Sequence, residues 1–152
     1  MGVTQVTVAI RNPGDPEKSW EGLFLVDTGS IDCLVPGNRL REIGLVPKGQ
    51  RSYELADGSE VTLDVTVAEV EFMGEMVGAT VIFGKDDTEP ILGVTALESV
   101  GIEIDPRTQR LKRLPSVRLK SAGRRLDHVE RIAKLGASLD LSGYTQRPSE
   151  GP

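Results

Sequence analysis

An acidic side chain follows an apolar run near the start of the chain, where Asp27 comes directly after residues 23–26 and precedes Thr28, Gly29 and Ser30. The apolar run predicts a buried strand, so the carboxylate would lie at the end of that strand. A charge in such a place is costly unless it is hydrogen-bonded or used in chemistry. Gly29 permits a tight turn, and the hydroxyls of Thr28 and Ser30 can bond the carboxylate or its loop. Asp27 is therefore a candidate catalytic group, with an ordinary Asp-Gly turn as the alternative.

Two further motifs lie downstream of this acid. The first is an alternating hairpin, residues 53–56 and 60–63, turned by Asp57-Gly58-Ser59. The second is Ile91-Leu92-Gly93, which precedes a short helix and a strand at residues 102–106. The motifs therefore occur along the chain in a fixed order: an acid loop, a hairpin, an apolar pair with glycine, and a short helix.

This order resembles that of the retroviral-type aspartic proteases, the retropepsins, and in particular of their small prokaryotic cytosolic relatives. The resemblance covers about residues 1–115. It implies an all-β fold, a closed β-barrel with a flap hairpin and one or two short helices, to which this chain adds a C-terminal helical extension. An unrelated small β-barrel with a coincidental acid loop is the alternative interpretation.

The resemblance also assigns roles to the residues of the three motifs. The expected site comprises catalytic Asp27, loop support from Thr28, Gly29 and Ser30, a flap at Ala56, Asp57, Gly58 and Ser59, and a loop-packing motif at Ile91, Leu92 and Gly93. Thr28 would bond across a dimer axis, and the hydroxyl of Ser30 is expected to donate to the Asp27 carboxylate. Two departures leave the strength of the dimer open: Val94 and Thr95 follow the third motif, and Gly58 is the only glycine of the flap.

Aspartic-protease chemistry needs two carboxylates that share one proton, because like charges at contact distance cannot both ionise. The chain has one Asp-Thr-Gly, and Asp57 follows no buried run. We therefore expect a homodimer in which Asp27 is contributed twice and a water is activated to hydrolyse a peptide bond of a peptide or protein substrate. The alternative is a catalytically silent peptide-binding or assembly module with the same fold.

Composition sets the broad class of protein. A chain of 152 residues with 38% hydrophobic and 4% aromatic content suits one domain whose core is built from Val, Leu and Ile. No signal peptide is expected, and no apolar run approaches the ~18 residues of a membrane span. The lone Cys33 fits a reducing compartment, so a cytoplasmic location is expected.

Charge divides the chain into two parts. Residues 1–106 carry 7 basic and 19 acidic side chains, whereas residues 107–152 carry 11 basic and 4 acidic ones. We predict a protease domain over residues 1–115, a basic linker with an amphipathic helix over 116–136, and a disordered tail over 137–152. The basic part either folds back on the acidic body, meets an acidic partner, or is a solvated appendage.

Local patterns predict the elements around the site. Val6, Val8 and Ile10 alternate with polar residues as in a strand, and a loop over 12–16 leads to a second strand over 20–26. Further predicted features are a short helix opened by Pro36 and closed by Gly44, a bulge near Ala68-Glu69, and a capping box of Thr95 and Glu98 on a helix that Gly101 ends.

Other chemistries have weaker support. Cys33 is expected to be a buried structural thiol because no histidine lies near it in the sequence, and His128 lies on the predicted C-terminal helix. Residues 86–89 are acidic but are expected to form a solvated loop rather than a calcium site. No metal or other cofactor is expected, and neither a membrane nor a nucleic acid is an expected partner.

Overall fold

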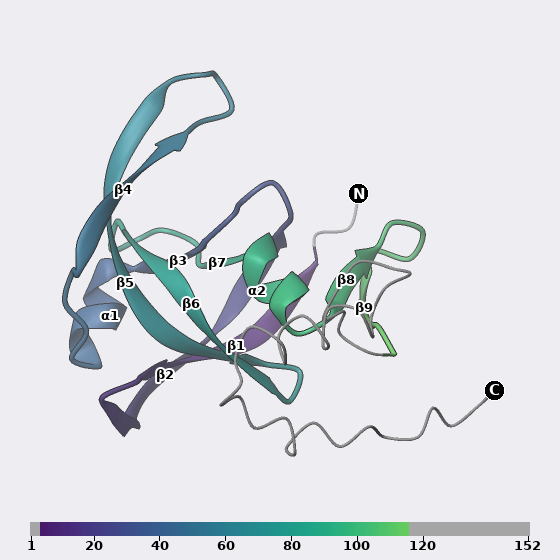
Figure 1. Ribbon diagram of the computed structural model, residues 1–152, viewed down its shortest axis with the longest axis horizontal. Coiled ribbons are helices and arrows are strands. Elements are labelled where there is room, and N and C mark those ends of the chain that lie inside the picture. The colour runs from purple at the N-terminus through teal and green to yellow at the C-terminus, as the bar shows by residue number, and fades with distance from the viewer. Residues whose placement is uncertain (1–3, 116–152) are drawn as a thin grey trace, which may run out of the picture. The chain divides into compact units, whose positions relative to one another are not determined.

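The computed structural model describes residues 4–115, which form a mostly β fold with two short helices (Figure 1). The elements are β1 Gln5–Asn12, β2 Asp15–Asp27, β3 Cys33–Pro36, α1 Gly37–Glu42, β4 Gly49–Glu54, β5 Glu60–Phe72, β6 Glu75–Gly84, β7 Ile91–Gly93, α2 Val94–Ser99, β8 Ile102–Asp105 and β9 Arg110–Arg113. The prediction of an all-β fold is confirmed. The helix and tail expected over 116–136 and 137–152 lie outside the described residues.

The main sheet has the strand order β1-β2-β7-β3-β6-β5-β4. Strand β1 also pairs with β5, so the strands run in a ring from β1 through β2, β7, β3, β6 and β5 back to β1. Strand β4 lies beyond this ring and pairs with β5, and together they form a hairpin that extends away from the other strands (Figure 1). Strands β8 and β9 form a separate two-stranded sheet.

The first two strands form where side chains alternate between apolar and polar. Val8 and Ile10 of β1 and Phe24 of β2 have no exposed surface, as expected for residues on one face of a half-buried strand. The loop predicted over 12–16 is shorter than expected, because β2 begins at Asp15 and continues the ladder with β1. Alternation is weak in this part of β2, so the pairing could not be read from the pattern.

The bulge predicted near Ala68-Glu69 is wrong. Strand β5 pairs with β6 without a register shift from Val65 to Phe72. The apparent change of phase has another cause. In the outer part of β5, which pairs only with β4, the partly buried residues are on one face of the strand. Within the ring, the residues on the other face are buried in the core. Val67 is consequently 58% exposed, and Ala68 beside it is fully buried.

Both helices begin directly after short strands. Helix α1 follows Pro36 and is followed by Gly44, whose φ of +82° favours glycine, as predicted. The capping box predicted for α2 is wrong, because the residue at its N-cap is Gly93 and no side chain caps the helix. Among the described residues, no helix combines the length and apolar character needed to cross a membrane.

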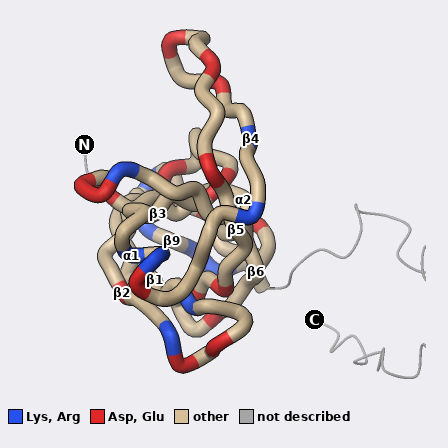
Figure 2. The backbone as a smooth tube through the Cα atoms, turned by 90° about the vertical axis from the view of Figure 1, so that its left-hand side faces the viewer, with Lys and Arg blue, Asp and Glu red and all other residues tan. Residues whose placement is uncertain are grey.

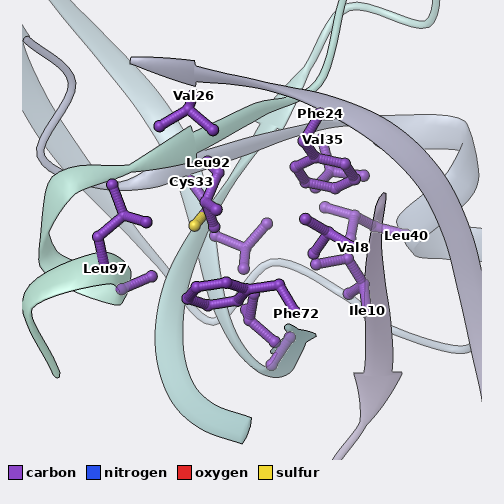
Figure 3. Packing of buried hydrophobic residues seen from close by; sticks show 14 of the residues in the cluster. Val8, Ile10, Phe24, Val26, Cys33, Val35, Leu40, Phe72, Leu92 and Leu97 are labelled. Carbon is purple, nitrogen blue, oxygen red and sulfur yellow. The ribbon is translucent and has the colours of Figure 1, made fainter. Parts of the chain in front are cut away.

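The hydrophobic core lies between the strands of the ring and beneath α2 (Figure 3). It includes the fully buried side chains of Phe24, Val35 and Leu92 and the nearly buried Leu97. Burying one such side chain stabilises a fold by roughly 1.5–3 kcal/mol relative to leaving it exposed. The core thereby fixes β2 and β7, the two strands that carry the candidate site at their ends.

Candidate active site

Asp27 is the last residue of β2, as predicted from the apolar run before it. Strand β2 pairs in parallel with β7, which places Val26 beside Leu92 and Asp27 beside Gly93. Val26 is 8% exposed and Leu92 is fully buried, so the residues directly before the acid and its neighbour are anchored in the core. The Asp27 side chain itself is half-buried. The loop-packing motif therefore lies next to the acid, and the two segments are held together by backbone pairing.

One oxygen of the Asp27 carboxylate is occupied by its own loop. Oδ1 accepts the backbone N–H of Gly29 at 2.9 Å, and the Asp27 carbonyl accepts the N–H of Ser30 at 3.1 Å. Oδ2 accepts no hydrogen bond from any residue in 4–115. Gly29 does not have a positive φ; a Cβ added there would lie 3.2 Å from Oδ1. A half-buried carboxylate with one free oxygen can accept a proton from a bound water.

The two hydroxyls of the loop do not bond this carboxylate. Ser30 donates its hydroxyl to the Asp32 carbonyl at 3.1 Å, so the expected bond from Ser30 to Asp27 is wrong. The loop therefore turns the Ser30 side chain toward the following backbone and away from Asp27. Thr28 is exposed, and its hydroxyl has no partner within the described part of the chain.

Gly93 is required by the close approach of the acid loop to β7. A Cβ at Gly93 would lie 2.6 Å from the carbonyl carbon and oxygen of Asp32 and 2.7 Å from the Ile31 oxygen. These are backbone atoms that cannot turn aside as a side-chain end would. The next two amides, at Val94 and Thr95, donate to the carbonyls of Ser30 and Ile31 at 2.8 and 3.2 Å. The loop thus satisfies the first free N–H groups of α2, and α2 in turn holds the loop.

The residues expected at the flap form the exposed tip of the β4–β5 hairpin. Ala56, Asp57, Gly58 and Ser59 are all exposed. Gly58 has a φ of +84°, and Asp57 accepts both the hydroxyl and the N–H of Ser59, at 2.5 and 2.9 Å. These bonds hold the pKa of Asp57 below its ordinary value, with the hydroxyl making the larger contribution. Acidic residues lie at the tip and along the stem of this hairpin (Figure 2).

Sequence reasoning missed a buried acid in the same loop. Asp32 is only 6% exposed. Its Oδ2 accepts a hydrogen bond from Tyr53 Oη at 2.6 Å and forms an ion pair with Arg51 Nη1 at 2.8 Å. Two signals could have found this cluster. Asp32 interrupts the apolar residues 31–35, and Arg51 and Tyr53 are two positions apart, so they share one face of β4.

The cluster changes the ionisation of its members. Burial, with the hydrogen bond to the Asp32 carboxylate second, raises the pKa of Tyr53 to about 12. The pKa of Arg51 is raised above its ordinary value, first by its hydrogen bond to Asp32. At neutral pH, Tyr53 therefore stays protonated and can donate its hydrogen bond, and Arg51 stays charged.

The remaining candidates contribute no second site. Cys33 is buried, and burial raises the pKa of its thiol to about 11, so the thiolate that a nucleophile needs is rare at neutral pH. Within residues 4–115, no three His, Cys, Asp or Glu side chains gather as a metal site would require. His128 lies outside the described residues.

Two comparisons with known proteins find no relative of this chain. No protein-family model matches the sequence, and a search of the curated proteins finds no match. The function is therefore argued from the residues and geometry of this chain.

Proposed function

We propose that this chain is an aspartic endopeptidase of the retropepsin type, that its ring of strands is the closed barrel of that fold, and that it acts as a homodimer. The observation that carries the proposal is the setting of Asp27, a half-buried carboxylate at a strand end. One of its oxygens is fixed by the Gly29 N–H, and the other accepts no hydrogen bond from residues 4–115. The parallel neighbour β7 supports the turn through Gly93. An ordinary surface Asp-Gly turn needs no such support from a buried strand.

The reaction needs a second carboxylate beside the first. No acidic side chain in residues 4–115 bonds Asp27, and Asp32 is already held by Arg51 and Tyr53. A second copy of the chain supplies the partner when the two Asp27 loops meet at a two-fold axis. One Asp27, ionised, takes a proton from the attacking water, and the other, protonated, polarises the scissile carbonyl and later helps to protonate the leaving nitrogen.

The β4–β5 hairpin is the flap of this proposal. Its tip carries apolar Leu55, 49% exposed, next to Asp57 and Gly58. A hairpin that extends from the ring can close over an extended peptide and exclude water from the acids. We propose that the peptide is held through its backbone.

The decisive experiment mixes two forms of the chain. Asp27→Asn removes both acids of a homodimer in one substitution and leaves the shape of the side chain almost unchanged. When increasing amounts of this variant are added to wild-type protein and subunits exchange, turnover per wild-type chain should fall as mixed dimers form. A matched addition of Asp57→Asn, whose chains keep most of their own activity, should not lower turnover per wild-type chain. Turnover that is indifferent to added Asp27→Asn chains would contradict a shared site.

A peptide-binding module without turnover is the second candidate. It is favoured by the absence of any acidic partner for Asp27 within residues 4–115, because a monomer could bind peptide but could not assemble the acid pair. Sedimentation of the chain separates the two functions, since only a dimer can be the enzyme. Cleavage of a proteome-derived peptide library, read by mass spectrometry, then identifies the substrates.

A further inference from the structure

The β4–β5 hairpin lacks a third strand along its outer half. Strand β4 pairs only with β5 among the described strands, and β6 pairs with β5 only from Val65 onward. Residues 60–64 of β5 therefore have β4 as their single neighbour. A two-stranded hairpin is at best marginally stable in water. Something other than strand pairing must set where this hairpin stands relative to the Asp27 loop.

The two faces of the hairpin differ in what they contact. The outward face carries polar pairs, Ser52 with Thr62 at 2.8 Å and Gln50 with Asp64 at 3.1 Å, which join β4 to β5 and nothing else. On the opposite face, Arg51 and Tyr53 reach out of the hairpin to Asp32, a residue of the Asp27 loop. Within residues 4–115, these are the side-chain hydrogen bonds that join the hairpin to that loop.

Asp32 is a firm anchor for such a contact. Its backbone carbonyl accepts the Ser30 hydroxyl and lies directly against Gly93, and its carboxylate is buried. The Arg51 side chain is by contrast 50% exposed. The ion pair thus joins a half-exposed guanidinium to a buried carboxylate, whereas Tyr53, which is itself less exposed than Arg51, makes the shorter contact, at 2.6 Å against 2.8 Å. The hairpin is therefore joined at its stem to a buried and firmly held residue of the Asp27 loop.

We propose that Arg51 and Tyr53 are positioning residues, which hold the stem of the hairpin over the Asp27 loop through their common partner Asp32. This role rests on the proposed function, in which the hairpin closes over the substrate. Freeing the stem weakens the closed state that holds peptide, so KM rises. Asp27 itself is held by β7 and keeps its geometry, so kcat changes less than KM.

The turnover experiment compares three single variants with the wild-type chain. Tyr53→Phe removes one hydroxyl, and we expect KM to rise about tenfold with kcat nearly unchanged. Arg51→Ala should raise KM less, and Arg51→Lys should recover part of that loss, because only Nη1 makes the contact. Ser52→Ala, on the outward face of the same strand, is the matched control and should leave KM at the wild-type value.

Amide hydrogen exchange tests the tether without any need for turnover. In chains that also carry Asp27→Asn, residues 50–63 should exchange about tenfold faster with Tyr53→Phe than with Ser52→Ala. Exchange in β1 and β2 should be equal in both. Equal hairpin exchange in these two chains, or an unchanged KM for Tyr53→Phe in an active enzyme, overturns the positioning role alone. A wild-type chain that cleaves no peptide overturns the proposed function, while faster hairpin exchange still supports the tether.

Discussion

Asp27 and Asp57 each accept the backbone N–H of the residue two positions later, Gly29 and Ser59, and both bonds measure 2.9 Å. Their local turns are thus closely alike, yet their surroundings are opposite. Asp27 ends a strand that is anchored in the core and lies beside Gly93. Asp57 lies at an exposed hairpin tip, where Ser59 adds its hydroxyl to the same oxygen.

The difference shows what a local turn provides for an acid and what the tertiary structure adds. A short Asp-Gly turn satisfies an acid by itself, and in solvent nothing more is needed. At Asp27 the same turn is backed by the parallel strand β7 and by the N-terminus of α2, which hold the loop in place. Within residues 4–115 the Oδ2 of each acid accepts no hydrogen bond, so the two acids differ in burial and in support from the core. A general base must be held in place beside its substrate, and only Asp27 is held in this way.

The largest expected effect separates the two acids directly. Asp27→Asn should lower turnover by about three orders of magnitude or more, because the amide cannot serve as a base. Asp57→Asn should retain most of the turnover, since that acid only orders the hairpin tip. Initial rates on a cleaved peptide, with circular dichroism to verify folding, measure both. An active Asp27→Asn chain would remove the basis of the comparison.

The glycines beside the two acids should differ in their effect on stability. Gly93→Ala forces a Cβ to within 2.6 Å of the Asp32 backbone, and we expect a loss of about 3 kcal/mol in the free energy of unfolding. Gly58→Ala meets no atom within 4 Å and suffers only from its φ of +84°, at about 1 kcal/mol. Urea denaturation gives both values. Equal losses would mean that the backbone of the acid loop can shift to make room for a Cβ at position 93.

The serine after Asp27 should affect stability rather than ionisation. Because Ser30 donates to the Asp32 carbonyl, Ser30→Ala should reduce the free energy of unfolding by about 1 kcal/mol. The acidic limb of the rate–pH profile should stay where it is in the wild-type enzyme. A displaced limb would show that the hydroxyl turns to Asp27 during the reaction.

Ser59, the serine after Asp57, should by contrast affect the ionisation of its acid. Ser59→Ala removes the main cause of the lowered pKa of Asp57, so that pKa should rise toward its ordinary value. A lowered pKa in the folded state contributes stability above the unfolded pKa, and this is lost as the pH falls through the folded pKa. The variant should therefore be slightly less stable than wild type at neutral pH, and the difference should vanish in acid. Carboxyl NMR titration with Asp57→Asn as the assignment control measures the shift.

The smallest expected effect concerns Cys33, which is buried in the hydrophobic core. A thiol that is 1% exposed with a pKa raised to about 11 should not react with alkylating reagents in the folded chain at pH 8. Turnover should survive both these reagents and metal chelators. Rapid alkylation of folded protein, followed by mass spectrometry, would show that β3 opens more readily than its burial suggests.

Much of the fold could be predicted because the relevant signals are local. Alternation in residues 6–10 and the apolar run before Asp27 predicted strands, and Gly44 marked the end of a helix. The bulge near Ala68-Glu69 was wrong because the same strand changes its neighbours along its length, and a pattern of apolar residues cannot distinguish that from an extra residue. The capping box was wrong because the acid loop supplies carbonyls to α2 in place of a side chain.

The sequence by itself determined that Asp27 ends a buried strand and that Asp57 and Gly58 turn a hairpin, since these features depend on neighbouring residues. Only the tertiary structure decided that Ser30 bonds away from the acid, that Gly93 admits no Cβ, and that the hairpin joins the Asp27 loop through Asp32. The physical reason is that a hydrogen bond or a steric contact between distant segments depends on distances of a few ångströms. Those distances arise when β2 pairs with β7 and when the β4–β5 hairpin comes to lie beside the Asp27 loop.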